Sequence, residues 1–368
     1  MSYAYPKALY IVRLQVENAS IISSHLTWGF PAPSAFTGFA HALQRKLNER
    51  EQYRNLECCG IGIVCHQFTP QVTKSSDYRY SPYQLNLARH PLESDGSTPA
   101  MVEEGKGHFE VSLIIGLSGD DLDQHLSAND EDLNEQTQYL IQRLNQLIYG
   151  IRLAGGAIFP HRRVKPKLVN WTLSEAINKT EKLRHALLPG FALLHRHEVL
   201  LAHQKWLSRQ QAYLETQEQN PDVLDTLLDI SRLNLSSKEQ SQLGAEGELK
   251  GIWQVRSRPE HLKGWLVPIP IGYAALTKLQ DKGSITGVRD NQYPATFVET
   301  LLSLGEWQSP HRISDLTHTL WTYNTEPKDG VYEITQPFAP KLNLQLLSDD
   351  LEEQSFDFDE LDLEEQED

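Results

Sequence analysis

A rigid segment that leads into an amphipathic helix constrains this chain more than any other feature. Residues 28–33 read WGFPAP, and each of the two prolines fixes its own backbone φ and lacks an N–H donor. After the prolines, apolar side chains recur three and four residues apart, at Phe36, Phe39, Ala40, Leu43 and Leu47. This spacing predicts a helix that buries one face, and Ser34 is the expected N-cap. The opposite face would carry Thr37, His41, Gln44, Arg45 and Asn48.

Around this helix, the first 170 residues predict two helices and four strands. The predicted strands are 8–16, 60–68, 108–117 and 151–159, and the second helix is 131–149, ended by Gly150. The resulting order, β-α-β-β-α-β, is that of the ferredoxin-like split unit, which RNA-recognition domains also use. The sequence therefore predicts an α+β fold with a ferredoxin-like core.

The remainder of the chain suggests additions to this core. Within the core domain, 1–170, residues 69–106 are polar without a clear period and are expected to form an inserted loop. Residues 171–250 predict a helical insertion followed by a linker at 237–250. Strand patterns return in 251–345 and are expected to complete the sheet, whereas 346–368 predicts a disordered acidic tail.

The charge balance depends on that tail. The formal net charge is −15, but residues 349–368 contain twelve acidic residues and no Lys or Arg, so the rest of the chain has 37 acids against 34 bases. Because the chain without residues 349–368 is nearly neutral, its charge does not exclude an RNA partner. The tail is read either as solubilising or as a docking strip for a basic partner, because Phe and Leu alternate with its acids.

The sequence also predicts the compartment. No apolar run approaches the roughly 20 residues that span a membrane, and the N-terminus does not resemble a secretory signal. The three cysteines, Cys58, Cys59 and Cys65, lie too close together to form a disulfide framework. We therefore expect a cytoplasmic protein without a membrane partner.

Searches for catalytic and metal-binding motifs are nearly empty. The sequence has no phosphate-binding glycine loop, no G-x-S-x-G elbow and no H-E-x-x-H motif, so we expect no enzymatic activity and no cofactor. His195 and His197 alternate along a predicted helix and would point to different faces, which disfavours a metal site. His41 remains as an alternative: in an RNA-cleaving relative of this fold, it would be the general base.

Basic clusters carry the binding prediction. His161, Arg162, Arg163, Lys165 and Lys167 follow the glycine pair 155–156, where a phosphate can approach the backbone closely. The alternative reading is an ordinary charged loop.

Two further clusters combine cations with aromatic residues. Arg256 and Arg258 lie with His261 and Lys263 between Trp253 and Trp265, and His311 and Arg312 follow Trp307. Cations beside aromatic rings suit single-stranded nucleic acid. The tryptophans of these clusters could equally belong to the hydrophobic core. Trp28 and Phe30 could either stack on bases or pack their loop against the core.

Several blocks together resemble a known family. These are LTWGFPAPSAFTGFAHALQRKL (26–47), RLAGGAIF (152–159), GWLVPIPIGYAAL (264–276), VRD (288–290) and FVETLLSLGEWQSPHR (297–312). The set, in this order, resembles the Csy-type subunit of the type I-F CRISPR surveillance (Cascade-like) complex that holds the 5′ handle of the crRNA.

The resemblance implies a RAMP protein that binds RNA without cleaving it. It implies pairing with the large subunit at the crRNA 5′ end, contact with the first backbone subunit, and indirect action on target DNA through the guide in antiviral defence. Chemistry inside the matched blocks then suggests the RNA-binding residues. These are Trp28, Phe30, Arg45, Gly155, Gly156, His161, Arg162, Arg163, Lys165, Arg256, Arg258, Arg289 and Arg312. An endoribonuclease using His41 and a purely protein-binding adaptor remain the competing hypotheses.

Overall fold

The chain divides into two compact units in the computed structural model. The first unit comprises residues 1–195, 269–302 and 307–339, and the second comprises 196–268, 303–306 and 340–368. The predicted acidic tail lies outside the described residues, so that prediction stays a prediction. The structure describes residues 3–74, 83–89, 91–126, 134–171, 176–209, 220–243, 249–288, 290–323 and 330–341, without the side chains of 176–178, 236–243 and 249–254.

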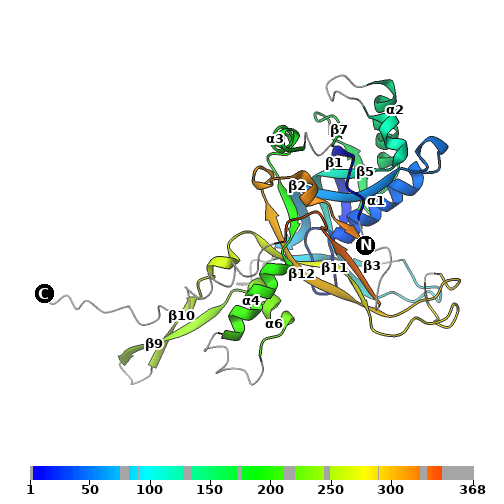
Figure 1. Cartoon of the computed structure of the whole chain (residues 1–368). Coiled ribbons are helices and arrows are strands. Elements are labelled where there is room, and N and C mark those ends of the chain that lie inside the picture. Colours follow the sequence, from blue (N-terminus) through cyan, green and yellow to red (C-terminus); the bar gives the residue numbers. More distant parts are fainter. Residues whose placement is uncertain are drawn as a thin grey trace. The chain divides into compact units, whose positions relative to one another are not determined.

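A large sheet dominates the first unit, as Figure 1 shows. Its strands lie in the order β13-β14-β11-β12-β8-β2-β5-β1-β6, with β3, β4 and β7 paired outside this path. The mixed α+β class that the sequence predicts is confirmed. The bounds are β1 Ala8–Ser20, β2 Glu57–Lys74, β3 Tyr83–Arg89, β4 Met101–Glu104, β5 Lys106–Ser118, β6 Ala157–Pro160, β7 Lys167–Asn170, β8 Phe191–His195, β11 Leu266–Ala275, β12 Val298–Gln308, β13 Thr322–Tyr323 and β14 Val331–Thr335.

The β1 strand lies between β5 on one side and both β6 and β7 on the other. All of these pairs are antiparallel, and β5 is paired in the same way with β2 on its far side. Side chains alternate along β1: Leu14 and Val16 are buried, whereas Gln15 and Glu17 are exposed. The strand therefore has one face for a core and another that is partly open to solvent.

Helix α1 covers the buried face, largely as the sequence predicts. It runs from Pro33 to Leu47, and all five residues of the apolar stripe are buried. Two details of the prediction are wrong. The N-cap is Ala32 rather than Ser34, because the helix already begins at Pro33. Proline suits the first helical position, since the N–H that it lacks would have no partner within the helix. Thr37 is buried rather than on the polar face, and its Oγ1 donates to the carbonyl of Ser34.

Helix α2, Glu135–Tyr149, packs beside α1 on the same face of the sheet. The Asn134 side chain caps it by accepting a hydrogen bond from the N–H of Thr137 at 2.7 Å. The Tyr10 hydroxyl on β1 donates to Asn145 Oδ1 at 2.8 Å and so ties α2 to the sheet.

The opposite face of the sheet is covered along only part of β1. There, Leu9, Val64 and Ile114 form a buried cluster with Trp171 and with residues of α3 (Ala176–Ala186) and of the segment 313–320. This cover ends before the exposed residues Gln15 and Glu17 of β1.

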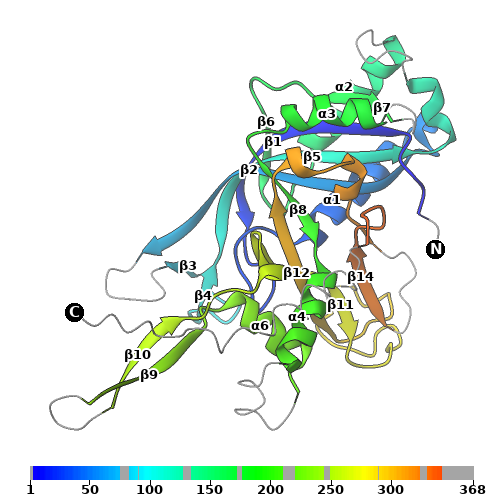
Figure 2. The same cartoon turned by 60° about the vertical axis from the view of Figure 1, so that its left-hand side comes forward.

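The segment 69–106 does not form the long loop that the sequence suggested. The β2 strand continues to Lys74 and pairs with β3, β3 pairs with β4, and β5 begins at Lys106 (Figure 2). Most side chains of β3 and β4 are exposed. They therefore lack the half-buried apolar alternation by which strands are recognised in a sequence.

The fourth predicted strand is also shorter than expected. Of the predicted strand 151–159, only residues 157–159 lie in β6 (Ala157–Pro160). The Gly155–Gly156 pair instead forms a turn in which Leu153 and Gly156 exchange backbone hydrogen bonds of 2.8 and 3.2 Å. Gly155 has a φ of +76°, a conformation that favours glycine.

The predicted helical insertion contains strands as well as helices. The apolar run FALLH forms β8, which joins the large sheet of the first unit. The second unit contains α4 (His197–Arg209), α6 (Val223–Ser231) and the two-stranded ribbon of β9 (Leu235–Leu243) and β10 (Leu249–Val255) (Figure 1). The linker prediction at 237–250 is therefore wrong. Its polar residues pair with a later segment, which local composition does not reveal.

In the part of the chain that the structure describes, none of the helices combines the length and apolarity that crossing a bilayer requires.

Candidate nucleic-acid interface

The partly open side of the sheet is built from residues 13–17 of β1 and their neighbours across the strands. Gln15 lies opposite Glu110 of β5 and also opposite Phe159 of β6. Residues directly opposite each other in a sheet share a face, so these three side chains form a row across three strands. We call Arg13, Gln15, Glu17, Glu110 and Phe159 the open face. Its Phe159 ring is 45% exposed.

An ion pair fixes the centre of the open face. Arg13 Nε donates to Glu110 Oε1 at 2.5 Å, and His161 Nε2 lies 3.7 Å from the same oxygen. All three side chains are largely buried, at 15–16% exposure, so the pair is shielded from solvent more than a surface ion pair is. The open face therefore has a rigid polar floor.

His66 of β2 borders this floor. Its Nε2 lies 2.7 Å from Ser112 Oγ, and its Nδ1 lies 2.6 Å from the carbonyl oxygen of Pro189, to which it donates. Burial lowers the pKa of His66 and outweighs the hydrogen bond to Pro189, which would raise it. His66 is therefore a neutral, structural hydrogen-bonding group at physiological pH.

The predicted basic cluster forms the connection between β6 and β7. Because β6 and β7 both pair with β1, residues 161–166 leave and return to the same sheet edge. His161 Nδ1 accepts the backbone N–H groups of Val164 at 2.9 Å and Arg163 at 3.3 Å, which holds the turn. Four exposed cations follow Phe159 within eight residues: Arg162, Arg163, Lys165 and Lys167. We call residues 161–167 the basic loop.

The glycine pair has two different roles. A side chain at Gly156 would lie 2.8 Å from the carbonyl oxygen of Glu17 and 2.8 Å from a methyl carbon of Val16, so β6 approaches β1 closely only because this residue is glycine. Around Gly155 the space is open. Of the two, Gly155 is the glycine that a phosphate can approach.

The two aromatic candidates of the first loop differ in exposure. Trp28 is 45% exposed and forms a β-bridge with Ile22. The Phe30 ring is half-buried and lies 5.0–6.0 Å, between ring centroids, from four other aromatic rings. Phe30 therefore packs its loop against the helix side of the sheet, while the Trp28 side chain remains partly exposed.

Arg45 and His41 lie on α1 and are exposed. Phe36 of this helix contacts Phe109, which lies opposite the buried Val16 of β1. The helix therefore packs on the sheet face opposite to the open face. The His41 ring lies 5.6 Å from the ring of Tyr323. The structure therefore does not bring Arg45 or His41 together with the basic loop.

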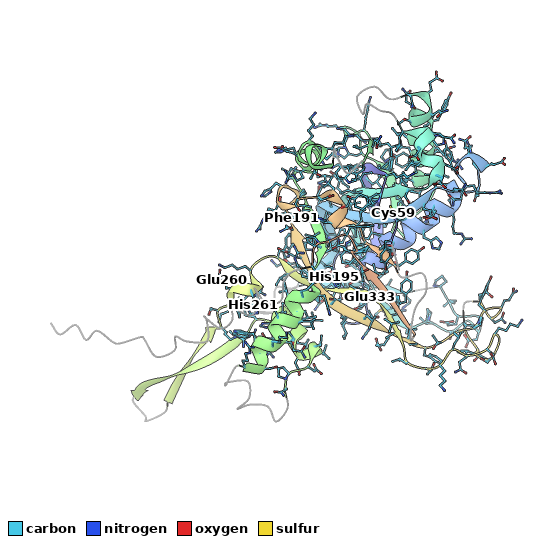
Figure 3. All side chains as sticks on the ribbon, in the orientation of Figure 1. Cys59, Phe191, His195, Glu260, His261 and Glu333 are labelled. Carbon is cyan, nitrogen blue, oxygen red and sulfur yellow. The ribbon has the colours of Figure 1, made fainter. Side chains whose placement is uncertain are left out.

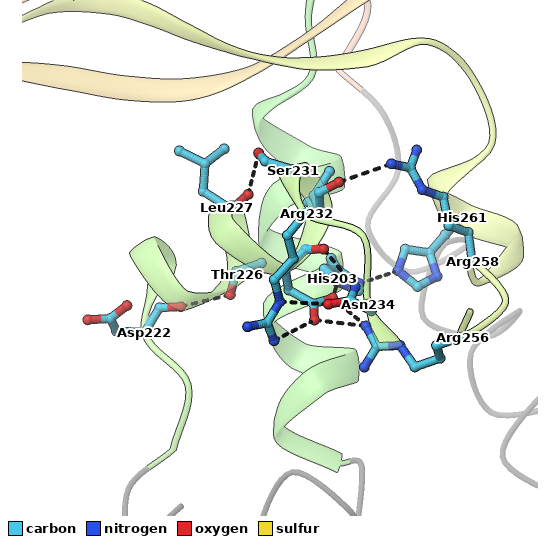
Figure 4. Close-up of polar contacts among 12 residues, drawn as sticks. His203, Asp222, Thr226, Leu227, Ser231, Arg232, Asn234, Arg256, Arg258 and His261 are labelled. Carbon is cyan, nitrogen blue, oxygen red and sulfur yellow. Dashed lines mark hydrogen bonds and ion pairs between the residues drawn. The ribbon is translucent and has the colours of Figure 1, made fainter. Parts of the chain in front are cut away.

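Arg256 and Arg258 belong to the second unit, where both make protein contacts (Figure 4). Arg256 Nη2 donates to both oxygens of the buried Asp229 carboxylate at 2.7 and 2.8 Å, and its guanidinium lies over Trp206. Arg258 donates to the carbonyl of Ile230 at 3.1 Å. Figure 4 shows the hydrogen bonds of Arg256 and Arg258 beside His203.

The same network contains two histidines. His203 Nε2 lies 2.9 Å from Asp229 Oδ2, and His203 Nδ1 lies 2.9 Å from His261 Nε2. Burial raises the pKa of Asp229, but hydrogen bonds from His203 and Arg256 outweigh it and bring the pKa to about 2. Burial, then the proximity of His203, lowers the pKa of His261 to about 4. His261 and Glu260 are labelled in Figure 3.

Two of the predicted RNA-binding residues remain, Arg289 and Arg312. Arg289 lies outside the described residues. Arg312 is exposed in the short helix η4 (Pro310–Arg312), next to Ile313 of the cluster that covers the other part of the sheet face.

Metal and thiol chemistry find no support among the described side chains. No group of three His, Cys, Asp or Glu residues in these stretches is placed to hold a metal ion. Burial raises the pKa of Cys59 and of Cys65 to about 12, so both thiols are protonated and weakly nucleophilic at neutral pH. Cys59, within the first unit, is labelled in Figure 3.

Phe159 and Glu110 belong to the open face although no sequence pattern singled them out. Their local patterns, AIFP and HFEV, show an outward residue beside a buried one, but only the strand register shows that they face each other across β1.

Comparison with known proteins decides the family. Residues 9–334 match the family of the CRISPR-associated protein Cas_Csy2. The chain belongs to the Csy2 family. It is 39% identical over 345 residues to the CRISPR-associated protein Csy2 of Pseudomonas aeruginosa (strain UCBPP-PA14), and the match covers 92% of this chain and 98% of that protein. The type I-F CRISPR resemblance is thereby confirmed, and the match to the Csy2 family includes the open face and the basic loop.

Proposed function

We propose that this Csy2-family chain is a non-catalytic RNA-binding subunit of a type I-F CRISPR surveillance complex, and that it holds the 5′ handle of the crRNA. One observation carries the assignment to a site: the exposed basic loop directly adjoins a polar, partly open sheet face with an exposed aromatic ring. Cations that bind phosphates and an aromatic group that contacts bases are the two components of single-stranded RNA recognition.

The fold supports this proposal. The strand order β6-β1-β5-β2, with α1 between β1 and β2 and α2 between β5 and β6, is the arrangement expected of a ferredoxin-like β-α-β-β-α-β unit. Both helices lie on one face, so a ligand can reach the part of the other face that α3 and the segment 313–320 do not cover. We infer that this is the RAMP-type core and that β3 and β4 are inserted between its second and third strands.

The RNA contacts divide by chemistry. Arg162, Arg163 and Lys165 bind handle phosphates, and Lys167 of the same loop adds a fourth such contact; these contacts position the RNA without reading its sequence. Gly155 allows a phosphate to approach the backbone, whereas Gly156 shapes the turn. His161 supports RNA binding indirectly: its Nδ1 accepts hydrogen bonds from the backbone N–H groups of Arg163 and Val164 and so holds the basic loop in place.

The other candidates take secondary places in the proposal. Trp28 offers a ring to the RNA, and Phe30 supports that loop from below. Arg45, Arg289 and Arg312 are additional phosphate contacts only if the RNA path extends beyond the basic loop. Arg256 and Arg258 first stabilise the second unit.

Membership in the Csy2 family supports a proposal about the partners of the chain. We propose that the chain pairs with the large subunit at the crRNA 5′ end and contacts the first backbone subunit. Target DNA is then recognised through guide pairing, in the service of antiviral defence. The proposal places the protein in the cytoplasm, where crRNA and invading DNA meet.

The endoribonuclease alternative, with His41 as general base, is less well supported. A general base must come within hydrogen-bond reach of the proton that it removes. RNA on the open face is separated from His41 by the sheet itself. If the chain cleaved repeat RNA and His41→Ala abolished the cleavage, the non-catalytic assignment would be wrong.

Co-purification tests the proposal directly. The full chain is co-expressed with the other subunits and a guide RNA, and the RNA retained per complex is measured. We expect Arg162→Glu combined with Arg163→Glu to reduce the retained RNA at least about tenfold, because reversal both removes phosphate contacts and adds repulsion.

The matched control reverses Arg50 and Arg54, two exposed arginines near the end of α1. It carries the same change in net charge and should leave RNA retention unchanged. Equal loss in both variants, or full retention in the Arg162/Arg163 variant with an intact assembly, would favour a protein-binding adaptor instead.

A further inference from the structure

Phe159 occupies a position that packing alone does not explain. On β6 only Ile158 is buried: it is 8% exposed and lies on the α2 side, whereas Phe159 is 45% exposed and points to the other side of the strand. Isolated exposed apolar side chains are common on proteins. What distinguishes Phe159 is its setting, because it lies on the open face and three residues before Arg162.

The surroundings of the ring are polar and ordered. Gln15 lies opposite Phe159 in the strand register, and Glu110 lies opposite Gln15 on the next strand. Opposite side chains in an antiparallel sheet have Cβ atoms about 5 Å apart. Glu110 is held by Arg13 at 2.5 Å, so the carboxylate at the far end of this row is positioned in advance of binding.

The basic loop is within reach of the same ligand. Three residues of chain span at most about 11 Å, so the Arg162 backbone lies no further than this from Phe159. A ring that offers a π-face, beside exposed guanidinium groups, matches single-stranded nucleic acid better than an apolar protein surface, which would be met by apolar neighbours.

We propose that Phe159 stacks one unpaired nucleobase of the bound RNA, with the amide of Gln15 and the carboxylate of Glu110 positioned along the edge of that base and Arg162 on an adjoining phosphate. This rests on the proposed function and adds a base-contacting residue to it. A flat base in this position covers the ring and also excludes water from the Arg13–Glu110 pair.

Ultraviolet crosslinking of the full chain to its guide RNA in the assembled complex tests the proposal. A base stacked on an aromatic ring crosslinks to it efficiently, and trypsin releases Phe159 in the fragment 153–162. We expect an RNA adduct on this fragment, located at Phe159, and expect Phe159→Ala to abolish it.

Affinity measurements on single-stranded RNA complement the crosslink. Phe159→Ala should weaken binding about 5- to 150-fold, the range for loss of one stacked base, while Phe159→Tyr and Phe159→Trp retain near-normal affinity. Val164→Ala is the matched control, because it removes an exposed apolar side chain from the basic loop. It should change binding less than about twofold.

The outcomes separate this proposal from the proposed function. If RNA is retained and responds to reversal of Arg162 and Arg163, but Phe159→Ala alters neither affinity nor crosslinking, the stacking assignment is wrong while the RNA-binding assignment stands. If no RNA is retained by the wild-type complex, both are wrong. If Phe159→Ala instead releases a protein subunit and leaves RNA bound, the ring is a protein contact and the stacking proposal is overturned.

Discussion

The salt dependence of RNA binding follows from the number of cations on the basic loop. Arg162, Arg163, Lys165 and Lys167 are all exposed. Each phosphate contact with single-stranded nucleic acid contributes about −0.7 to the slope of log affinity against log salt, so four contacts give about −2.8. Between about 50 and 200 mM salt, the affinity of the wild-type chain should therefore fall about 50-fold.

Replacing Arg162 and Arg163 by glutamine removes two of these contacts without adding repulsion. The expected slope is then about −1.4, and the same salt change weakens binding only about 7-fold. Fluorescence anisotropy with a labelled single-stranded RNA and the full chain measures both slopes. The two curves should converge at high salt, where phosphate contacts contribute little.

A result with unchanged slope would refute this reasoning, even if the double variant bound more weakly at every salt concentration. It would mean that the two arginines act through protein structure rather than through phosphate neutralisation. A flat salt response in the wild-type chain would refute the phosphate contacts altogether.

Three further predictions concern stability and charge. Asp229→Asn should destabilise the second unit by about 2–3 kcal/mol, because it weakens charge-assisted hydrogen bonds from Arg256 and His203. Since the pKa of Asp229 is about 2 against an ordinary 3.8, its contribution is present above pH 4 and is lost as pH falls from about 4 to about 2, which acid titration of wild type and variant compares. Gly156→Ala should cost about 2 kcal/mol by thermal melting, since its Cβ would overlap β1. Removal of 346–368 should raise non-specific RNA affinity about 3- to 10-fold at low salt, because twelve acidic residues are lost.

Each of these has a control. Glu260→Gln weakens an exposed ion pair with Lys263 in the same unit and should cost less than about 1 kcal/mol. In Gly155→Ala the added Cβ lies in open space, so the variant should lose only about 1 kcal/mol of stability, the cost of a positive φ at a residue other than glycine. Equal costs for the two glycine variants would contradict the role assigned to Gly156. An unchanged affinity after tail removal would show that the tail does not oppose RNA.

The parts of the fold that were predicted from sequence are those with local patterns. The stripe on α1 and the cores of β1, β2 and β5 have the periodicity of elements that bury one side, so their existence was clear. The β3, β4 and β9 strands were missed because most of their residues are polar or exposed. Their strand conformation depends on pairing with segments elsewhere in the chain, which no local pattern reports.

The candidate site shows the same limit. The basic loop was found because its cations are consecutive in sequence. Phe159 and Glu110 were missed because they are 49 residues apart and meet only across β1. Arg256 was assigned to RNA from its neighbours in sequence, whereas Asp229, 27 residues earlier, holds its guanidinium.

The most direct test of the account is a photoreactive nucleotide placed at the 5′ end of the guide in the assembled complex, with the crosslinked peptides identified by mass spectrometry. We predict that this end of the guide attaches to residues between Gly155 and Lys167 of this chain. Attachment only to another subunit, with these residues unmodified, would contradict it.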